Sequence, residues 1–128
     1  MLKRSDVVFD YSIETICHED SLELTDADRQ RIHDTIRDDE RRLFVVTHGT
    51  DTMAHTARVL TDIPDKVIVL TGASQPARFY SSNAIFNIGC AVAAAQILPP
   101  GVYIAMNGRV FAGDKVRKNP ETRKFEDA

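Results

Sequence analysis

Cysteine is scarce in this sequence, and long apolar runs and any excess of positive charge are absent from it. The two cysteines, Cys17 and Cys90, form no CxxC motif and no plausible disulfide framework, which favours reduced thiols in a cytoplasmic protein. No run approaches the ~18 apolar residues of a membrane span, and the first residues contain no apolar stretch of signal length. The net charge of −3 and the scattered basic residues argue against a nucleic-acid binder. We therefore expect neither a membrane nor a nucleic acid as a partner.

Metal-ligand patterns are missing as well, because His18, His33, His48 and His55 do not have the spacing of a metal site. No internal repeat, linker or low-complexity segment interrupts the chain of 128 residues, of which 43% are hydrophobic and 27% charged. We therefore expect a single domain over residues 1–128, long enough to bury roughly two thirds of its unfolded surface.

The sequence alternates between strand patterns and helix patterns. Short apolar runs predict strands at residues 7–16, 43–46, 66–71 and 102–106. Helical spacing predicts helices that begin after Thr25, after Thr52 and at Asn83. Thr25 and Asp28 resemble a capping box, and Asn107-Gly108 is the strongest hairpin signal in the sequence. This alternation predicts an α/β domain with a parallel sheet that helices cover on both faces.

Apolar spacing also predicts which face of each helix is buried. The first helix is expected to bury Ile32 and Ile36. The side chains expected to face inward from the second and third helices are Met53, Ala54, Ala57, Leu60, Ile85, Ile88, Val92 and Ala95.

The turn HGTDT, after the strand at 43–46, combines a glycine with two hydroxyls and a carboxylate. In open α/β sheets the chemistry gathers at the carboxyl ends of the strands, where this turn is expected. Gly49 allows a ligand to approach the backbone, and the helix start favours an anion. Asp51 offers the opposite charge, so the turn suits a zwitterion such as an amino acid. A plain turn in which Thr50, Asp51 or Thr52 caps the helix explains the same residues.

A threonine hydroxyl becomes a good nucleophile only when a base takes its proton. A neutral lysine can be that base, and Lys118, after the predicted hairpin, could fold back over the sheet edge. Thr50 would then attack the amide carbon of glutamine or asparagine, and backbone N–H groups would stabilise the oxyanion. Spacing alone does not distinguish Lys118 among the 16 lysines and arginines.

The stretch VVTHGTDTM closely resembles the signature of the bacterial-type L-asparaginases, the asparaginase/glutaminase family. The resemblance continues through EDSLELTDADR, VIVLTGASQPA, SSNAIFNIGCAVAAA and VYIAMNGRVFAGDKVRKN. It is closest to short stand-alone forms of the N-terminal domain of that family. The resemblance implies a flavodoxin-like three-layer sandwich. It also implies hydrolysis of the side-chain amide of asparagine, glutamine or a related small amide to an acid and ammonia, without a cofactor or metal.

The same resemblance assigns roles to individual residues. Ser21 matches the serine that binds the α-carboxylate of the substrate. Thr50 matches the threonine of the second catalytic triad, and Asp51 matches the aspartate that also holds the α-amino group. Lys118 matches the lysine of that triad. The backbone at Ala73 matches a position that lines the amide pocket.

The sequence also departs from the family pattern. The first strand of the family ends in Thr-Gly-Gly-Thr, whose last threonine is the primary nucleophile, and a tyrosine in the next loop assists it. Neither is in this sequence, so we expect that first strand to be missing; Thr71-Gly72 matches a different position. Asn83 stands where relatives commonly have aspartate. The C-terminal domain, which completes the site of a neighbouring subunit in full-length relatives, is expected to be absent.

Two hypotheses therefore stay open. The first is an asparaginase-like amidohydrolase that works as a homo-oligomer in the cytoplasm. The second is an inactive domain that binds an acidic amino acid through Ser21, Thr50 and Asp51.

Overall fold

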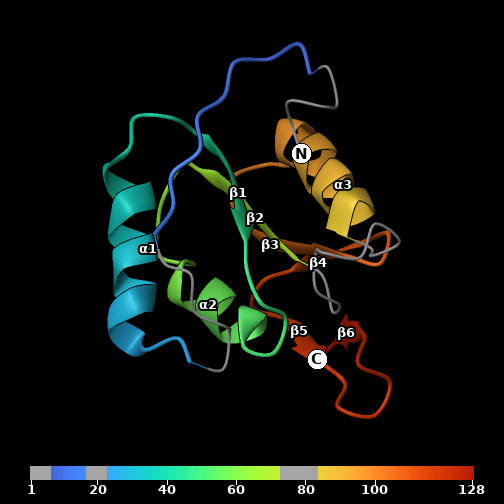
Figure 1. Cartoon of the computed structure of the whole chain (residues 1–128). Helices are drawn as coiled ribbons and strands as arrows, with labels where there is room; N and C mark the ends of the chain where they lie inside the picture. The colour runs from blue at the N-terminus through green and yellow to red at the C-terminus, as the bar shows by residue number, and fades with distance from the viewer. Residues whose placement is uncertain (1–6, 17–22, 73–83) are drawn as a thin grey trace.

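A four-stranded sheet with helices on both faces forms the centre of the structure, a computed structural model that describes residues 7–16, 23–72 and 84–128 (Figure 1). The strand order is β1-β2-β3-β4; the first three are parallel, and β4 is antiparallel to β3. A separate hairpin, β5-β6, follows. This arrangement confirms the predicted α/β sandwich with a mainly parallel sheet. The elements are α1 (Asp26–Asp38), β1 (Leu43–Thr47), α2 (Met53–Val59), β2 (Val67–Thr71), α3 (Ala84–Ile97), β3 (Gly101–Met106), β4 (Arg109–Ala112), β5 (Val116–Lys118) and β6 (Phe125–Asp127).

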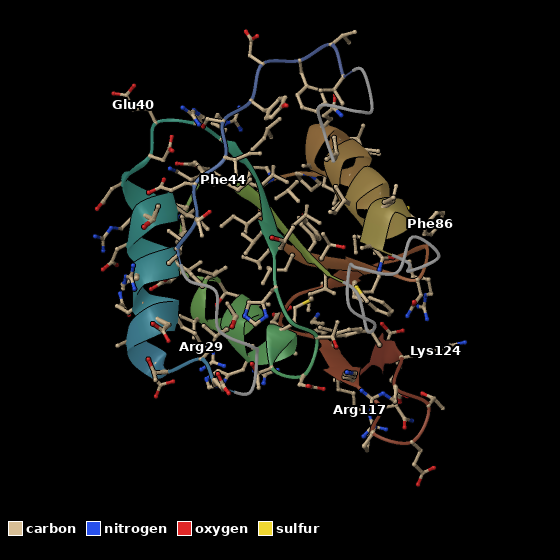
Figure 2. All side chains as sticks on the ribbon, viewed as in Figure 1. Arg29, Glu40, Phe44, Phe86, Arg117 and Lys124 are labelled. Atoms are coloured by element: carbon tan, nitrogen blue, oxygen red, sulfur yellow. The ribbon has the colours of Figure 1, made fainter. Side chains whose placement is uncertain are left out.

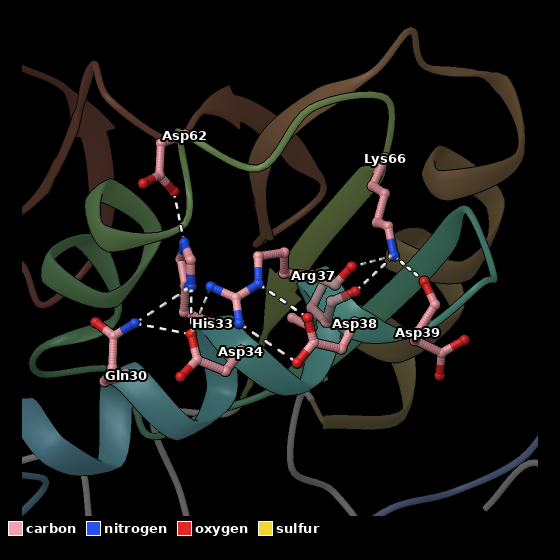
Figure 3. Close-up of polar contacts among 9 residues, drawn as sticks. Gln30, His33, Asp34, Arg37, Asp38, Asp39, Asp62 and Lys66 are labelled. Atoms are coloured by element: carbon pink, nitrogen blue, oxygen red, sulfur yellow. Dashed lines mark hydrogen bonds and ion pairs between the residues drawn. The ribbon is translucent and has the colours of Figure 1, made fainter.

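Helix α1 begins and ends at side chains that satisfy its free backbone groups. Thr25 Oγ1 accepts a hydrogen bond from the Asp28 N–H at 3.1 Å, and Asp28 Oδ2 accepts one from the Thr25 N–H at 3.0 Å, which confirms the predicted capping box. At the other end, Lys66 Nζ donates to the Ile36 carbonyl at 2.6 Å (Figure 3). A cation is favourable at this end because the last carbonyls of a helix have no helical partner.

Two cores lie on opposite faces of the sheet. On one face, α1 and α2 pack with β2 and β3, and the predicted Ile32 and Ile36 are both buried. In α2, Met53, Ala57 and Leu60 are buried as predicted, whereas Ala54 is only partly buried.

On the other face, α3 packs against the sheet through small side chains. Ala84, Asn87, Ala91, Ala94 and Ala95 are its buried residues. Of the predicted stripe only Ala95 is buried; Ile88 and Val92 are half-buried and Ile85 is 55% exposed, so the predicted face is wrong in part. Nearly every side of this helix is apolar, so two stripes have helical spacing, and the one with smaller side chains lets the helix approach the sheet closely.

Residues 7–16 form neither a strand nor a helix, and the strand predicted there is wrong. Val8 and Ile13 are exposed, whereas Ile16 packs against the core. The Ile16 carbonyl accepts a hydrogen bond from Arg31 Nη2 at 3.0 Å. An alternating apolar pattern becomes a strand only where a neighbouring strand pairs with its backbone, and none of the described strands pairs with this segment.

Strand β1 has β2 on one side, and within the described ranges no strand lies on its other side. Leu43, at the start of β1, is 51% exposed, and the next three residues are half-buried. All of β2, in contrast, is buried.

The end of the chain returns to the sheet through two hairpins. Asn107 and Gly108 have φ angles of 55° and 81°, the two left-handed positions of a type I′ turn, which confirms the predicted hairpin between β3 and β4. Strands β5 and β6 then pair antiparallel, with Lys118 opposite Phe125. Val116 and Phe125 are buried in the same core as α2. This burial fixes the position of Lys118 relative to the turn before α2.

Candidate active site

The structure brings Thr50, Asp51 and Lys118 together. Lys118 Nζ donates a hydrogen bond to Thr50 Oγ1 at 2.7 Å and to Asp51 Oδ1 at 2.9 Å. Thr50 and Asp51 lie in the turn between β1 and α2, and Lys118 ends β5. Thr50 is 7% exposed, and the side chains of Lys118 and Asp51 are 11% and 43% exposed. A buried hydroxyl, a shielded amine and a half-exposed carboxylate therefore form one group at the carboxyl end of β1.

The other predicted site residues are Gly49, Ser21 and Ala73. Gly49 is exposed in the same turn, next to Thr50. Ser21 and Ala73 lie outside the described residues. Thr52 is the N-cap residue of α2, but its side chain makes no capping hydrogen bond. The predicted side-chain cap is therefore wrong for Thr52, whose hydroxyl accepts from an arginine instead.

The turn is held against β2 by backbone contacts. The His48 N–H donates to the Thr71 carbonyl at 2.9 Å, which extends the contact between β1 and β2 by one residue. At Gly72, a Cβ atom would lie 2.1 Å from the His48 carbonyl oxygen, so a larger residue would displace the turn. The glycine therefore allows the two strand ends to approach each other beside Thr50.

A buried arginine supports the turn from behind, and the sequence analysis did not identify it. Arg29, labelled in Figure 2, is 4% exposed between α1 and α2. Its Nε donates to Thr56 Oγ1 at 2.9 Å, its Nη2 to Thr52 Oγ1 at 2.8 Å and its Nη1 to the Leu24 carbonyl at 3.2 Å. The signal was its place on the stripe of Ile32 and Ile36, three and seven residues earlier on the same helix face.

His48 links this arginine to the turn. Its Nε2 lies 2.8 Å from Thr56 Oγ1 and its Nδ1 lies 2.5 Å from the Gly49 carbonyl oxygen. Burial lowers the pKa of His48; the contact with the Gly49 carbonyl opposes this shift, and the Arg29 charge adds to it. The neutral ring fits both contacts, because Nδ1–H can donate to the carbonyl while Nε2 accepts from the Thr56 hydroxyl. Arg29, Thr56 and His48 therefore form a chain of hydrogen bonds that ends next to Thr50.

A hollow of about 230 Å³ opens beside the group, lined by Asp51, Lys118, Pro120 and Arg123. Another hollow, of about 270 Å³, lies at the opposite end of the sheet, near Gly101 and Asp114. The second hollow is slightly larger, but its lining has a single charged side chain and no lysine–threonine contact. The chemistry is therefore concentrated at the first hollow.

Within residues 7–16, 23–72 and 84–128, no cluster of three or more histidine, cysteine, aspartate or glutamate side chains could hold a metal ion. The helices in these ranges are all too short or too polar to cross a membrane.

Comparison with known proteins gives a family for this chain. A family model described as "Asparaginase, N-terminal" matches residues 1–126. The L-asparaginase of Thermococcus kodakarensis is 36% identical over 83 residues, which is 62% of this chain and 25% of that protein. The glutaminase-asparaginase of Pseudomonas aeruginosa is 32% identical over 130 residues, which is 96% of this chain and 35% of that protein.

A third relative has a different name. It belongs to the glutamyl-tRNA(Gln) amidotransferase of Methanococcus vannielii and is 39% identical over 90 residues, which is 63% of this chain and 21% of that protein. The chain thus spans about a third or less of the length of these relatives. Since the family model matches nearly every residue, the chain belongs to the asparaginase family, in the part that corresponds to its N-terminal domain.

Proposed function

We propose that this chain, as one domain over residues 1–128, hydrolyses the side-chain amide of asparagine, glutamine or a related small amide to a carboxylic acid and ammonia. The observation that carries the proposal is the contact of Lys118 Nζ with Thr50 Oγ1 at 2.7 Å and with Asp51 Oδ1 at 2.9 Å. The membership of the chain in the asparaginase family supports the same chemistry.

In the proposed reaction, Lys118 in its neutral form takes the proton of the Thr50 hydroxyl. The hydroxyl oxygen attacks the amide carbon, and the carbonyl electron pair moves to the oxygen. Lys118 then returns the proton to the amide nitrogen, and the carbon–nitrogen bond breaks to release ammonia. Water hydrolyses the remaining ester of Thr50 and releases the acid. Asp51 holds the substrate ammonium through its exposed part.

The alternative function is an amino-acid-binding domain without turnover. One observation favours it: Lys118 donates hydrogen bonds to both Thr50 and Asp51, which is the arrangement of a charged ammonium rather than of a base. A charged lysine of this kind would hold the carboxylate in place for a ligand ammonium. Both functions need the same three residues, so only a measurement of turnover separates them.

The test is ammonia release from asparagine and glutamine. It should be measured for this chain and for a chain extended by the codons that precede Met1 in its reading frame, because the resemblance places a second threonine nucleophile before this sequence. We expect the substitution Lys118→Met to lower the rate by about 10²- to 10⁴-fold, the usual effect of losing a general base. Lys115→Met, which removes a lysine that is exposed nearby, should leave the rate unchanged.

The outcomes separate the two functions. Equal loss from Lys115→Met and Lys118→Met would remove Lys118 from the reaction. No ammonia from either length of chain, together with binding of aspartate, would favour the domain without turnover.

The proposal includes a homo-oligomer in the cytoplasm that acts on a small amino-acid amide. The cysteine usage supports the location, since Cys17 and Cys90 form no recognisable disulfide pattern. The exposed Leu43, on the open side of β1, supports self-association.

A further inference from the structure

A second cation lies beside the Lys118–Asp51 pair. Of the side chains that line the hollow, Lys118 and Asp51 neutralise each other across 2.9 Å. Arg123 lines the same hollow, and its guanidinium makes no ion pair or side-chain hydrogen bond with the described residues. The described lining therefore has two cations and one carboxylate, which leaves it with a net positive charge.

The backbone of Arg123 is fixed by the loop between β5 and β6. The Asn119 N–H donates to the Lys124 carbonyl and the Arg123 N–H donates to the Asn119 carbonyl, both at 2.8 Å. Asn119 Oδ1 also accepts from the N–H groups of Glu121 and Thr122, at 2.8 and 3.2 Å. These bonds close a small turn, so Arg123 stays beside Lys118 rather than moving with a loose tail.

Arg123 has an unusual backbone conformation. Its φ angle is 61°, in the left-handed region that glycine or asparagine adopts more readily than arginine. A conformation of this kind is costly and is retained mainly where the surrounding structure or a function requires it. An arginine at this position therefore points to a use for its side chain in the hollow.

We propose that Arg123 determines specificity by binding the carboxylate of the substrate, while Asp51 binds its ammonium. A guanidinium offers two parallel N–H donors that match a carboxylate, and the hollow supplies the positive field that such a group needs. Ser21, to which the resemblance gives the α-carboxylate, has no charge of its own. The inference rests on the proposed function only for the amide; the recognition of the carboxylate can be measured without turnover.

The experiment uses two small probes that share an amide and differ in charge. Succinamate has a carboxylate and no amine, and 3-aminopropanamide has an amine and no carboxylate. Binding of each is measured by calorimetry, with NMR to show that the probe stays intact. We expect Arg123→Gln to weaken succinamate about 10- to 100-fold, the value of one charged hydrogen-bonded contact, and to leave 3-aminopropanamide within about twofold.

Two further variants make the test specific. Arg117→Gln removes the same charge from β5, but Arg117 is paired with Glu126 at 3.0 Å and does not line the hollow, so both affinities should stay unchanged. Asp51→Asn should show the opposite selectivity, with weaker binding of 3-aminopropanamide and not of succinamate.

The inference is overturned if wild-type protein does not bind succinamate, or if Arg123→Gln and Arg117→Gln weaken it equally. Ammonia release is recorded in parallel. Turnover without any effect of Arg123→Gln on succinamate would leave the proposed function standing and remove Arg123 from it. Selective loss of succinamate in a protein that releases no ammonia would support Arg123 and reject the amidohydrolase.

Discussion

Arg29 is the most deeply buried charged side chain in the described part of the chain, at 4% exposure. Its three hydrogen bonds to Thr56, Thr52 and the Leu24 carbonyl join α1 to α2 behind the candidate site. A hydrogen bond to a charged group contributes about 1.5–3 kcal/mol, but an apolar replacement recovers part of that through packing. Arg29 therefore stabilises the turn more through its geometry than through its charge.

We expect Arg29→Met to lower the free energy of unfolding by about 2–3 kcal/mol, because the hydroxyls of Thr52 and Thr56 lose their donor. Urea denaturation at neutral pH measures the change. Arg58→Met is the control, since Arg58 is exposed on α2 and a surface substitution costs less than about 0.5 kcal/mol. Equal stability of Arg29→Met and the wild type would mean that the hydrogen bonds add nothing beyond packing.

His33 joins α1 to the segment after α2. Its Nε2 lies 2.6 Å from Asp62 Oδ1 and its Nδ1 lies 3.0 Å from Asp34 Oδ1 (Figure 3). Burial alone would lower the pKa of His33, but the hydrogen bonds and charges of the two aspartates raise it above its ordinary value. Because the folded state binds the proton more tightly than the unfolded state, the stabilisation is complete below about pH 6.5.

We therefore expect stability to fall as the pH rises from about 6.5 through the raised pKa of His33. His48 acts in a different window, because its pKa is lowered and its effect appears as the pH falls below about 6.5. Urea denaturation of wild type and Asp62→Asn between about pH 6.5 and 8.5 tests His33. The variant should show a flatter dependence; an equally steep curve would separate Asp62 from the effect.

Glycines at two elements should respond to alanine in opposite directions. At Gly108, φ is 81° and the nearest atoms to an added Cβ are those of the Phe86 ring, at 3.6 Å, so the cost is in the backbone and not in a clash. At Gly89, within α3, an added Cβ meets nothing within 4 Å. Alanine at Gly89 should therefore stabilise the helix without steric cost.

We expect Gly108→Ala to destabilise the protein by about 1–2 kcal/mol and Gly89→Ala to stabilise it by about 0.5–1 kcal/mol. Thermal unfolding of both variants at one pH measures the difference. Two shifts of the same sign would contradict the assignment of the β3–β4 turn or of α3.

The elements that the sequence predicts well are those with local causes. The capping box of Thr25 and Asp28 and the turn at Asn107-Gly108 depend on neighbours within four residues, and both were found as predicted. The buried face of α3 depends on how closely a helix approaches a sheet, which spacing does not specify. The contact of Lys118 with Thr50 spans 68 residues, and only the family resemblance, not the local pattern, selected it.

The whole molecule presents two features that favour association. Within the described ranges, β1 has an open side, and Leu43 on this strand is 51% exposed. Unpaired strand edges pair readily with other chains, and the net charge of −3 gives only weak repulsion between copies.

We expect this chain to self-associate with increasing concentration, and Leu43→Lys to reduce that association. Sedimentation velocity over a hundredfold range of concentration measures it. Ile97→Lys is the matched control, because Ile97 is 82% exposed at the end of α3, away from β1. A monomer at all concentrations, with a cooperative thermal transition, would show that the open side of β1 does not drive pairing.

The position of Lys118 has a consequence for the order in which the molecule is made. A ribosome releases the turn with Thr50 and Asp51 first and adds the next 67 or 68 residues before Lys118 exists, which takes several seconds at roughly 5–20 residues per second. Val116 and Phe125 must then be buried before the lysine is held at the turn. A growing chain therefore has the hydroxyl and the carboxylate but no amine between them, and it stays chemically silent until its last segment has docked.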